Sequence, residues 1–133
     1  MSSDPIDRSS ARNNKVLAFY LVLLSLHVAH VFEEAWGQFF LLQYFGLGWY
    51  LFLNWLLFCI PVIVFYFVLR RRKWAYRLSI VYAGFMILNG LGHAVATTVT
   101  GRYYHGFAGG VSGIGLVVAG GMLIYYLRTD TPS

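Results

Sequence analysis

Two histidines and two adjacent glutamates stand at the end of the first long apolar stretch of the chain. The segment HVAHVFEE, residues 27–34, contains His27, His30, Glu33 and Glu34, and its glutamates are two of only five acidic residues in the sequence. Imidazole and carboxylate groups together bind zinc or iron, and they also exchange protons. The segment is therefore a candidate site for metal binding or for acid–base chemistry.

The spacing of the polar residues indicates that they share helix faces. His27, His30 and Glu34 are spaced i, i+3, i+7, which places them on one face of a helix. Asn89 and His93 are spaced i, i+4 and share a face of a later helix. Ionisable groups inside a membrane normally face the bundle interior and have partners there. We therefore expect these two faces to lie opposite each other.

Membrane-spanning helices must position these residues, because the composition is not that of a soluble domain. The chain is 59% hydrophobic and only 11% charged, whereas a soluble domain has about 25% charged residues. Four apolar stretches are long enough to cross a bilayer as helices. They run approximately over residues 16–36, 49–69, 78–99 and 107–127. The predicted fold is an all-α membrane protein, a four-helix transmembrane bundle.

The basic residues predict the orientation of this bundle. They precede the first span, fill the connection between the second and third spans, and follow the fourth, whereas the other two connections hold only Arg102. By the positive-inside rule, both termini are expected to be cytoplasmic. The net charge of +5 is thus a topology signal, and we expect no nucleic-acid binding. A multi-pass protein of a bacterial-type cytoplasmic membrane is expected, with the lipid bilayer as its main partner.

The domain organisation follows from the same pattern. Residues 1–14 are expected to form a flexible polar tail, residues 15–128 the four-span membrane domain, and residues 129–133 a short C-terminal tail. The fourth span is rich in glycine and contains G-x-x-x-G spacings from Gly106 to Gly110 and from Gly109 to Gly113. Such residues allow close helix packing. Packing within the bundle is favoured, and a homodimer through this helix is the alternative.

The polar residues of three helices are predicted to lie at similar depths in the membrane. At about 1.5 Å per residue, His30 lies about 21 Å from the inner surface, and His93 and Asn54 lie about 22 Å from it. Three helices thus place polar side chains in the outer half of the bilayer.

The motif around His30 resembles that of a known family. His30-Val31-Phe32-Glu33-Glu34 reads H-x-x-E-E, and an N-x-x-x-H pattern follows at Asn89 and His93. The chain is similar, over roughly residues 15–128, to the HXXEE-motif family of small multi-span membrane proteins. The resemblance implies a multi-span architecture and these candidate residues, but no particular reaction.

The first functional hypothesis is a metal-dependent enzyme that acts on an apolar or lipid-like substrate. His30, Glu34 and His93 are the expected ligands of zinc or iron, with a position left open for water or substrate. Glu33 and Glu34 are the candidate catalytic residues, and Glu33 is the expected acid–base group. The residues expected to hold a substrate or ligand are Asn89, Asn54 and His27.

Two alternatives remain open at this point. A glutamate–histidine pair could perform metal-free acid–base chemistry, as in an isomerase-like enzyme, or bind a ligand without chemistry. The same residues could instead have a structural role or relay ions. Few polar residues lie below His27 and Asn89, so a path through the whole membrane is not favoured.

Overall fold

The computed structural model describes residues 5–130, with side chains from residue 13 onward. Within these residues the backbone forms four long helices and no strand. They are α1 (Pro5–Trp36), α2 (Leu42–Leu69), α3 (Lys73–Thr100) and α4 (Gly110–Thr129), and a short helical turn, η1 (Tyr103–Phe107), precedes α4. Each of the four is long and apolar enough to cross a membrane. The predicted all-α, four-helix membrane fold is confirmed.

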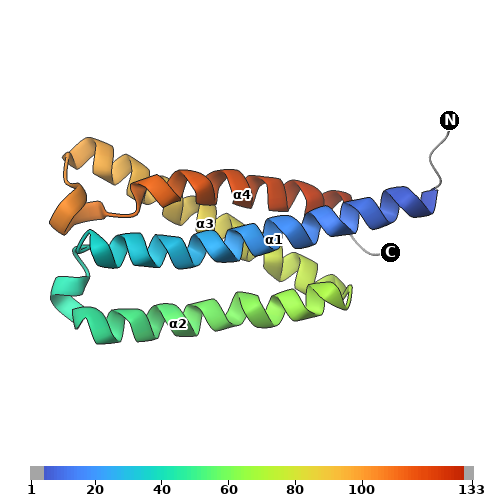
Figure 1. The fold of residues 1–133 in the computed structure, drawn as a ribbon, viewed down its shortest axis with the longest axis horizontal. Helices are drawn as coiled ribbons and strands as arrows, with labels where there is room; N and C mark the ends of the chain where they lie inside the picture. Colours follow the sequence, from blue (N-terminus) through green and yellow to red (C-terminus); the bar gives the residue numbers. More distant parts are fainter. Residues whose placement is uncertain (1–4, 131–133) are drawn as a thin grey trace.

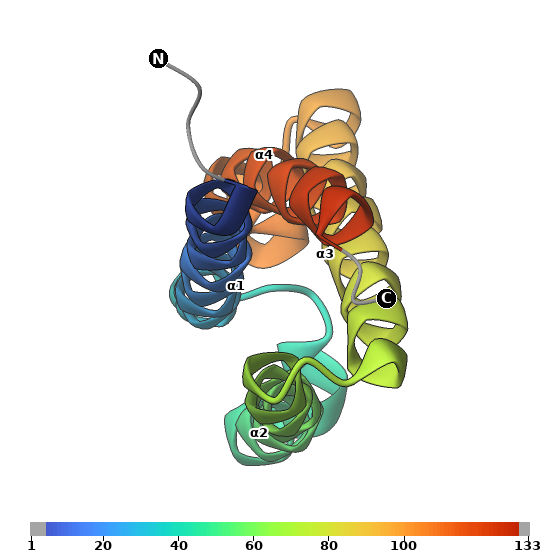
Figure 2. The same ribbon diagram turned by 90° about the vertical axis from the view of Figure 1, so that its right-hand side faces the viewer.

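The helices run up and down, so that α1 begins and α4 ends at the same end of the bundle (Figure 1). Viewed along the helices, α1, α4 and α3 follow one another in an arc, and α2 lies across its open side (Figure 2). The connections α1–α2 and α3–α4 therefore lie together at one end, and the connection α2–α3 lies at the other, beside the end of α4.

The helices do not begin and end at the same residues as the predicted apolar stretches. Helix α1 begins at Pro5 and thus includes residues 5–14 of the segment expected to be a flexible tail. Helix α2 begins at Leu42, and its backbone departs from helical geometry at Gly46 (φ 71°, ψ 158°). Hydropathy locates the part of a helix that crosses hydrocarbon, whereas the helix itself continues into polar sequence. The remaining residues of the two predicted tails, 1–4 and 131–133, lie outside the described residues.

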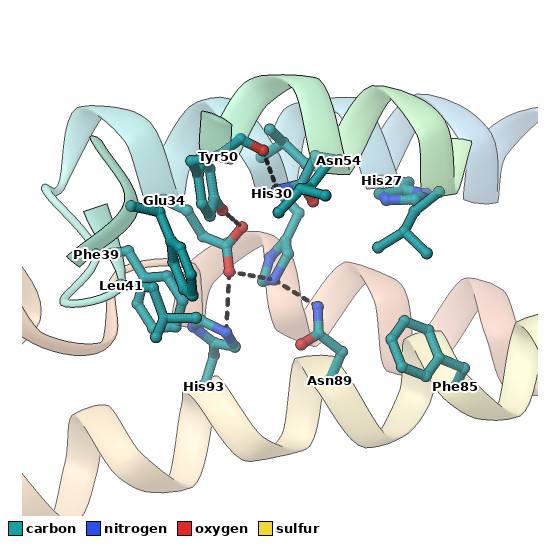
Figure 3. A pocket seen from close by; sticks show the side chains of 14 residues that line it. His27, His30, Glu34, Phe39, Leu41, Tyr50, Asn54, Phe85, Asn89 and His93 are labelled. Atoms are coloured by element: carbon teal, nitrogen blue, oxygen red, sulfur yellow. Dashed lines mark hydrogen bonds and ion pairs between the residues drawn. The ribbon is translucent and has the colours of Figure 1, made fainter. Parts of the chain in front are cut away.

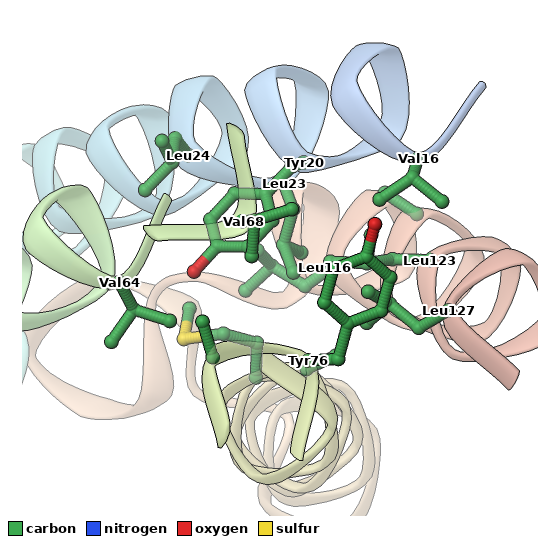
Figure 4. Packing of buried hydrophobic residues seen from close by; sticks show 14 residues of the cluster. Val16, Tyr20, Leu23, Leu24, Val64, Val68, Tyr76, Leu116, Leu123 and Leu127 are labelled. Carbon is green, nitrogen blue, oxygen red and sulfur yellow. The ribbon is translucent and has the colours of Figure 1, made fainter. Parts of the chain in front are cut away.

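The apolar core fills the end of the bundle where α1 begins and α4 ends (Figure 4). Fully buried side chains from all four helices meet there, among them Val16, Tyr20, Val68, Tyr76, Leu116 and Leu127. Beside this core, Asp130 accepts a hydrogen bond from the Tyr76 hydroxyl at 3.3 Å and lies 3.5 Å from an Arg71 guanidinium nitrogen. These contacts tie the end of α4 to the α2–α3 connection.

Helices α3 and α4 approach each other closely through glycines. A Cβ atom built on Gly90 would lie 2.4 Å from the carbonyl oxygen of Gly113, and one built on Gly113 would lie 2.7 Å from that of Gly90. Neither position can therefore accept a larger residue without moving a helix. Gly109 and Gly113 of the predicted G-x-x-x-G pair thus pack against α1 and α3 of the same chain.

Candidate metal centre

His30, Glu34 and His93 come together at the end of the bundle opposite the apolar core. The Oε1 atom of Glu34 lies 3.0 Å from His93 Nε2 and 3.5 Å from His30 Nε2 (Figure 3). The three side chains are buried, with exposed fractions of 1% for His30, 5% for Glu34 and 6% for His93. Helix α1 supplies two of them one turn apart, and α3 supplies the third from the facing side.

Hydrogen bonds from the far side of each ring fix both histidines. His93 Nδ1 donates to the carbonyl oxygen of Ala108 at 2.5 Å. His30 Nδ1 lies 2.8 Å from the Ser112 hydroxyl oxygen, which itself can donate to the Gly109 carbonyl at 3.4 Å. Nδ1 therefore bears the proton in each of these hydrogen bonds, and both Nε2 atoms, the nitrogens that would bind a metal, lie on the side of Glu34.

The second oxygen of Glu34 has a different partner. The hydroxyl of Tyr50, on α2, donates a hydrogen bond to Glu34 Oε2. This leaves Oε1 directed at the two imidazoles and fixes the plane of the carboxylate. Tyr50 is buried, so this contact also holds α2 against the centre.

Asn89 contacts the same cluster. Its Nδ2 atom lies 3.0 Å from His30 Nε2 and donates to it, which agrees with an unprotonated nitrogen there. This amide occupies the lone pair that a metal would use, so metal binding has to displace this hydrogen bond. Asn89 thus lies where it can orient either His30 or a bound ligand.

A cavity of about 280 Å³ adjoins the cluster between α1, α2 and α3. His30, Glu34, Tyr50 and His93 supply polar groups to it, and the rest of its wall is mainly apolar, including Phe39, Leu41, Phe45 and Leu53. A ligand in this cavity would therefore reach the three converging atoms through apolar surroundings.

Asn54 and His27, the other expected ligand-binding residues, also line this cavity, but each has a partner within the protein. Asn54 Nδ2 donates to the Tyr50 carbonyl oxygen at 3.0 Å, one turn earlier in α2. His27 Nδ1 lies 3.2 Å from the Tyr82 hydroxyl, at the end of the cavity away from Glu34 and His93 (Figure 3).

Glu33 is not brought into the cluster. Its carboxylate accepts hydrogen bonds from the backbone N–H groups of Val111 at 3.1 Å and Ser112 at 2.7 Å, and from the Tyr103 hydroxyl at 2.7 Å. Val111 and Ser112 lie in the first turn of α4, whose own N-cap, Gly109, provides no side-chain hydrogen bond. A carboxylate there satisfies N–H groups that have no partner within the helix and complements the helix dipole.

Tyr103 lies outside the membrane-spanning segments. Burial, followed by the hydrogen bond to the Glu33 carboxylate, raises the pKa of Tyr103 to about 12. Its hydroxyl therefore remains a donor to Glu33 at neutral pH.

Sequence reasoning did not identify Tyr50, Ser112 or Gly109 as part of this site. Tyr50 stands one turn before Asn54, and Ser112 is the one hydroxyl residue between positions 110 and 124, so weak signals existed for these two. Gly109 (φ 111°) has a different reason to be glycine, since a Cβ atom there would lie 2.6 Å from His30 Cε1 and 3.0 Å from His93 Nδ1. That requirement is visible only in the fold.

The geometry fits a small divalent metal. One ligand atom from each of His30, Glu34 and His93 can be chosen so that all three lie within 4.8 Å of one another. Tetrahedral zinc ligands, with bonds of about 2.0–2.1 Å, lie about 3.4 Å apart, close to the 3.0 Å and 3.5 Å from Glu34 Oε1 to the two histidines. Two imidazoles and a carboxylate are a donor set that both zinc and iron accept.

Comparison with known proteins adds no relative to this description. No family model, curated protein or solved structure matches the chain. Its resemblance to the HXXEE-motif family stays a prediction, and the site is interpreted below from its own geometry.

Proposed function

We propose that this chain is an integral membrane metalloprotein that binds zinc or iron through His30, Glu34 and His93 and acts on an apolar, lipid-like substrate. The observation that carries the proposal is the convergence of two Nε2 atoms and one carboxylate oxygen, all buried, at the wall of a cavity. Burial of ionisable groups in a membrane is costly, and interhelical polar contacts return only about 0.6 kcal/mol on average. A purely structural role therefore explains this arrangement poorly.

Each surrounding residue has a task in this proposal. Ser112 and the Ala108 carbonyl hold the two imidazoles in the metal-binding tautomer, and Tyr50 orients the carboxylate. A bound metal would act as a Lewis acid toward a carbonyl group or lower the pKa of a bound water. With three protein ligands, one position remains for that water or substrate. Asn89, released from His30, has an amide group available to hold the substrate.

One observation favours metal-free acid–base chemistry as a second candidate. Tyr50, Glu34, His93 and the Ala108 carbonyl form a continuous series of hydrogen bonds and ion-pair contacts. Such a series can move a proton to or from a substrate without a metal. The two candidates differ in whether purified protein contains a stoichiometric metal.

Metal analysis of detergent-purified protein tests the proposal. We expect about one zinc or iron ion per chain in the parent and loss of that metal in Glu34→Gln and His93→Ala. His27→Ala is the matched control, because it removes another histidine from the membrane region of α1 but leaves the three ligands in place.

The results separate the candidates. Metal in the parent and in His27→Ala, but not in the two ligand variants, supports the metal centre. A folded parent that takes up no zinc or iron, even after incubation with either ion, contradicts it and leaves the acid–base candidate. Equal metal retention in all four proteins would place the metal elsewhere.

A further inference from the structure

A second cavity of about 280 Å³ lies between α2 and α3, on the side of the first cavity away from Glu34. Most of its wall is apolar and comes from the two facing helices, including Leu57, Ile60, Val64, Leu78, Val81 and Phe85. Ile60 and Val81 are exposed at 59% and 67%, so this cavity opens toward the surrounding membrane between the two helices.

The two cavities adjoin each other and share part of their walls. His27, Leu57 and Phe85 line both of them, and His27 and Phe85 lie at the end of the first cavity away from Glu34 and His93 (Figure 3). Taken together, the two cavities extend along α2, with polar groups at one end and a mainly apolar wall over the rest of their length. We call this space the α2–α3 groove.

The length of the groove is that of a long hydrocarbon chain. Helix α2 rises about 21 Å between Tyr50, at the polar end, and Val64, at the apolar end. The hydrocarbon thickness of one leaflet is about 15 Å. The groove therefore has room for a complete membrane-lipid chain whose polar end lies at the cluster.

We infer that the α2–α3 groove binds a single-chain fatty acyl compound, with its carbonyl-containing head at His30, Glu34 and His93 and its chain between α2 and α3. This inference deepens the proposed function and rests on it, because the head group is held at the metal. A lipid reaches the groove from the membrane through the exposed opening beside Ile60 and Val81.

The surrounding membrane affects which acyl chains the groove can bind. Bilayer hydrocarbon is as apolar as the groove, so the chain gains little free energy simply by leaving the lipid. Affinity comes from the head group, and the length of the groove limits which chains fit. Filling the far end should therefore exclude long chains and leave short ones bound.

The test measures equilibrium binding of radiolabelled decanoic acid and stearic acid to zinc-loaded protein in lipid nanodiscs, with empty nanodiscs as background. Val64→Phe fills the apolar end of the groove, and Val118→Phe is the same change on an exposed face of α4. We expect the parent and Val118→Phe to bind both acids. Val64→Phe should bind stearic acid about tenfold more weakly and decanoic acid as the parent does.

Val64 is buried, so Val81→Phe, at an exposed position in the same groove, provides the same test if Val64→Phe does not fold. Equal stearic acid binding by the groove variants and Val118→Phe would overturn the inference. Binding of cholesterol but of neither fatty acid by the parent would also overturn it.

Zinc content, measured in the same samples, separates the two proposals. Zinc-containing protein that binds no fatty acid overturns the acyl ligand and leaves the metal centre standing. Parent protein that contains no zinc overturns the metal centre, and it therefore also overturns the proposed position of the acyl head group.

Discussion

Glu33 and Glu34 are neighbours in sequence, but their carboxylates have separate tasks. Glu34 faces the two histidines and Tyr50, whereas Glu33 accepts two backbone N–H groups of α4 and the Tyr103 hydroxyl. Adjacent helix positions differ in direction by about 100°. One glutamate can therefore face the cavity while the next anchors the start of another helix.

Exchange of each glutamate for glutamine should separate these tasks. Glu33→Gln keeps the metal but lowers the free energy of unfolding by about 1 kcal/mol, because a charged acceptor at the α4 N-terminus is lost. Metal content and the thermal midpoint in detergent measure the two effects, with Glu34→Gln as the variant that loses metal. Metal loss in Glu33→Gln at an unchanged midpoint would instead assign Glu33 to the centre.

Gly109 places the α4 N-terminus against both histidines. Gly109→Ala adds a methyl group within 2.6 Å of His30 Cε1 at a backbone φ of 111°, so the ring must move. We expect metal affinity to fall at least about tenfold, as measured by competition with a chelator.

Gly101→Ala is the control for Gly109→Ala. It strains another positive-φ glycine (φ 63°), but no atom lies within 4 Å of the added methyl group. Metal affinity should therefore match that of the parent. An equal fall in both variants would mean that backbone strain, and not displacement of the rings, weakens the site.

At the scale of elements, the contact of α3 with α4 holds His93 in place relative to α1. Gly113→Ala places a methyl group 2.7 Å from the Gly90 carbonyl oxygen, and overpacking of this kind costs about 1–3 kcal/mol. We expect a lower thermal midpoint in detergent. Gly121→Ala, in the same helix but with no atom within 4 Å of the added methyl group, should leave the midpoint unchanged or raise it. The reverse order would show that α3 and α4 do not pack through Gly113.

The elements were predictable where the physical signal is strong. Long apolar stretches identify four spans because a helix must satisfy its backbone groups within hydrocarbon. The 3.6-residue period also placed His30 and Glu34 on one face of α1. The ends of the helices were not predictable, as the start of α2 at Leu42, before the break at Gly46, illustrates.

Contacts between helices were harder to predict. Whether Glu33 meets α4, or Ser112 meets His30, depends on the rotation and separation of two packed helices. Side-chain packing sets both, and no local pattern in a single sequence records them. Gly109 is a clear case, because its environment consists of two rings from two other helices.

At the scale of the whole molecule, the distribution of basic residues predicts the orientation of the bundle in the membrane. The connection α3–α4, at the end that holds the candidate metal centre, contains Arg102. At the opposite end, Arg70, Arg71 and Arg72 lie between α2 and α3, and Lys73 begins α3. The positive-inside rule places that opposite end, and both termini, in the cytoplasm. A reporter enzyme that is active only outside the cytoplasm should give signal when fused after residue 102 and none after residue 72. The reverse pattern would place the candidate metal centre on the cytoplasmic side.

X-ray absorption at the metal edge of purified, metal-loaded protein tests the central claim most directly. We expect two imidazole ligands and oxygen at about 2.0–2.1 Å in the parent protein. The sequence contains a single cysteine, Cys59, on α2, and it is not part of the predicted site. Sulfur scattering at about 2.3 Å, or a spectrum without imidazole, would contradict a centre built from His30, Glu34 and His93.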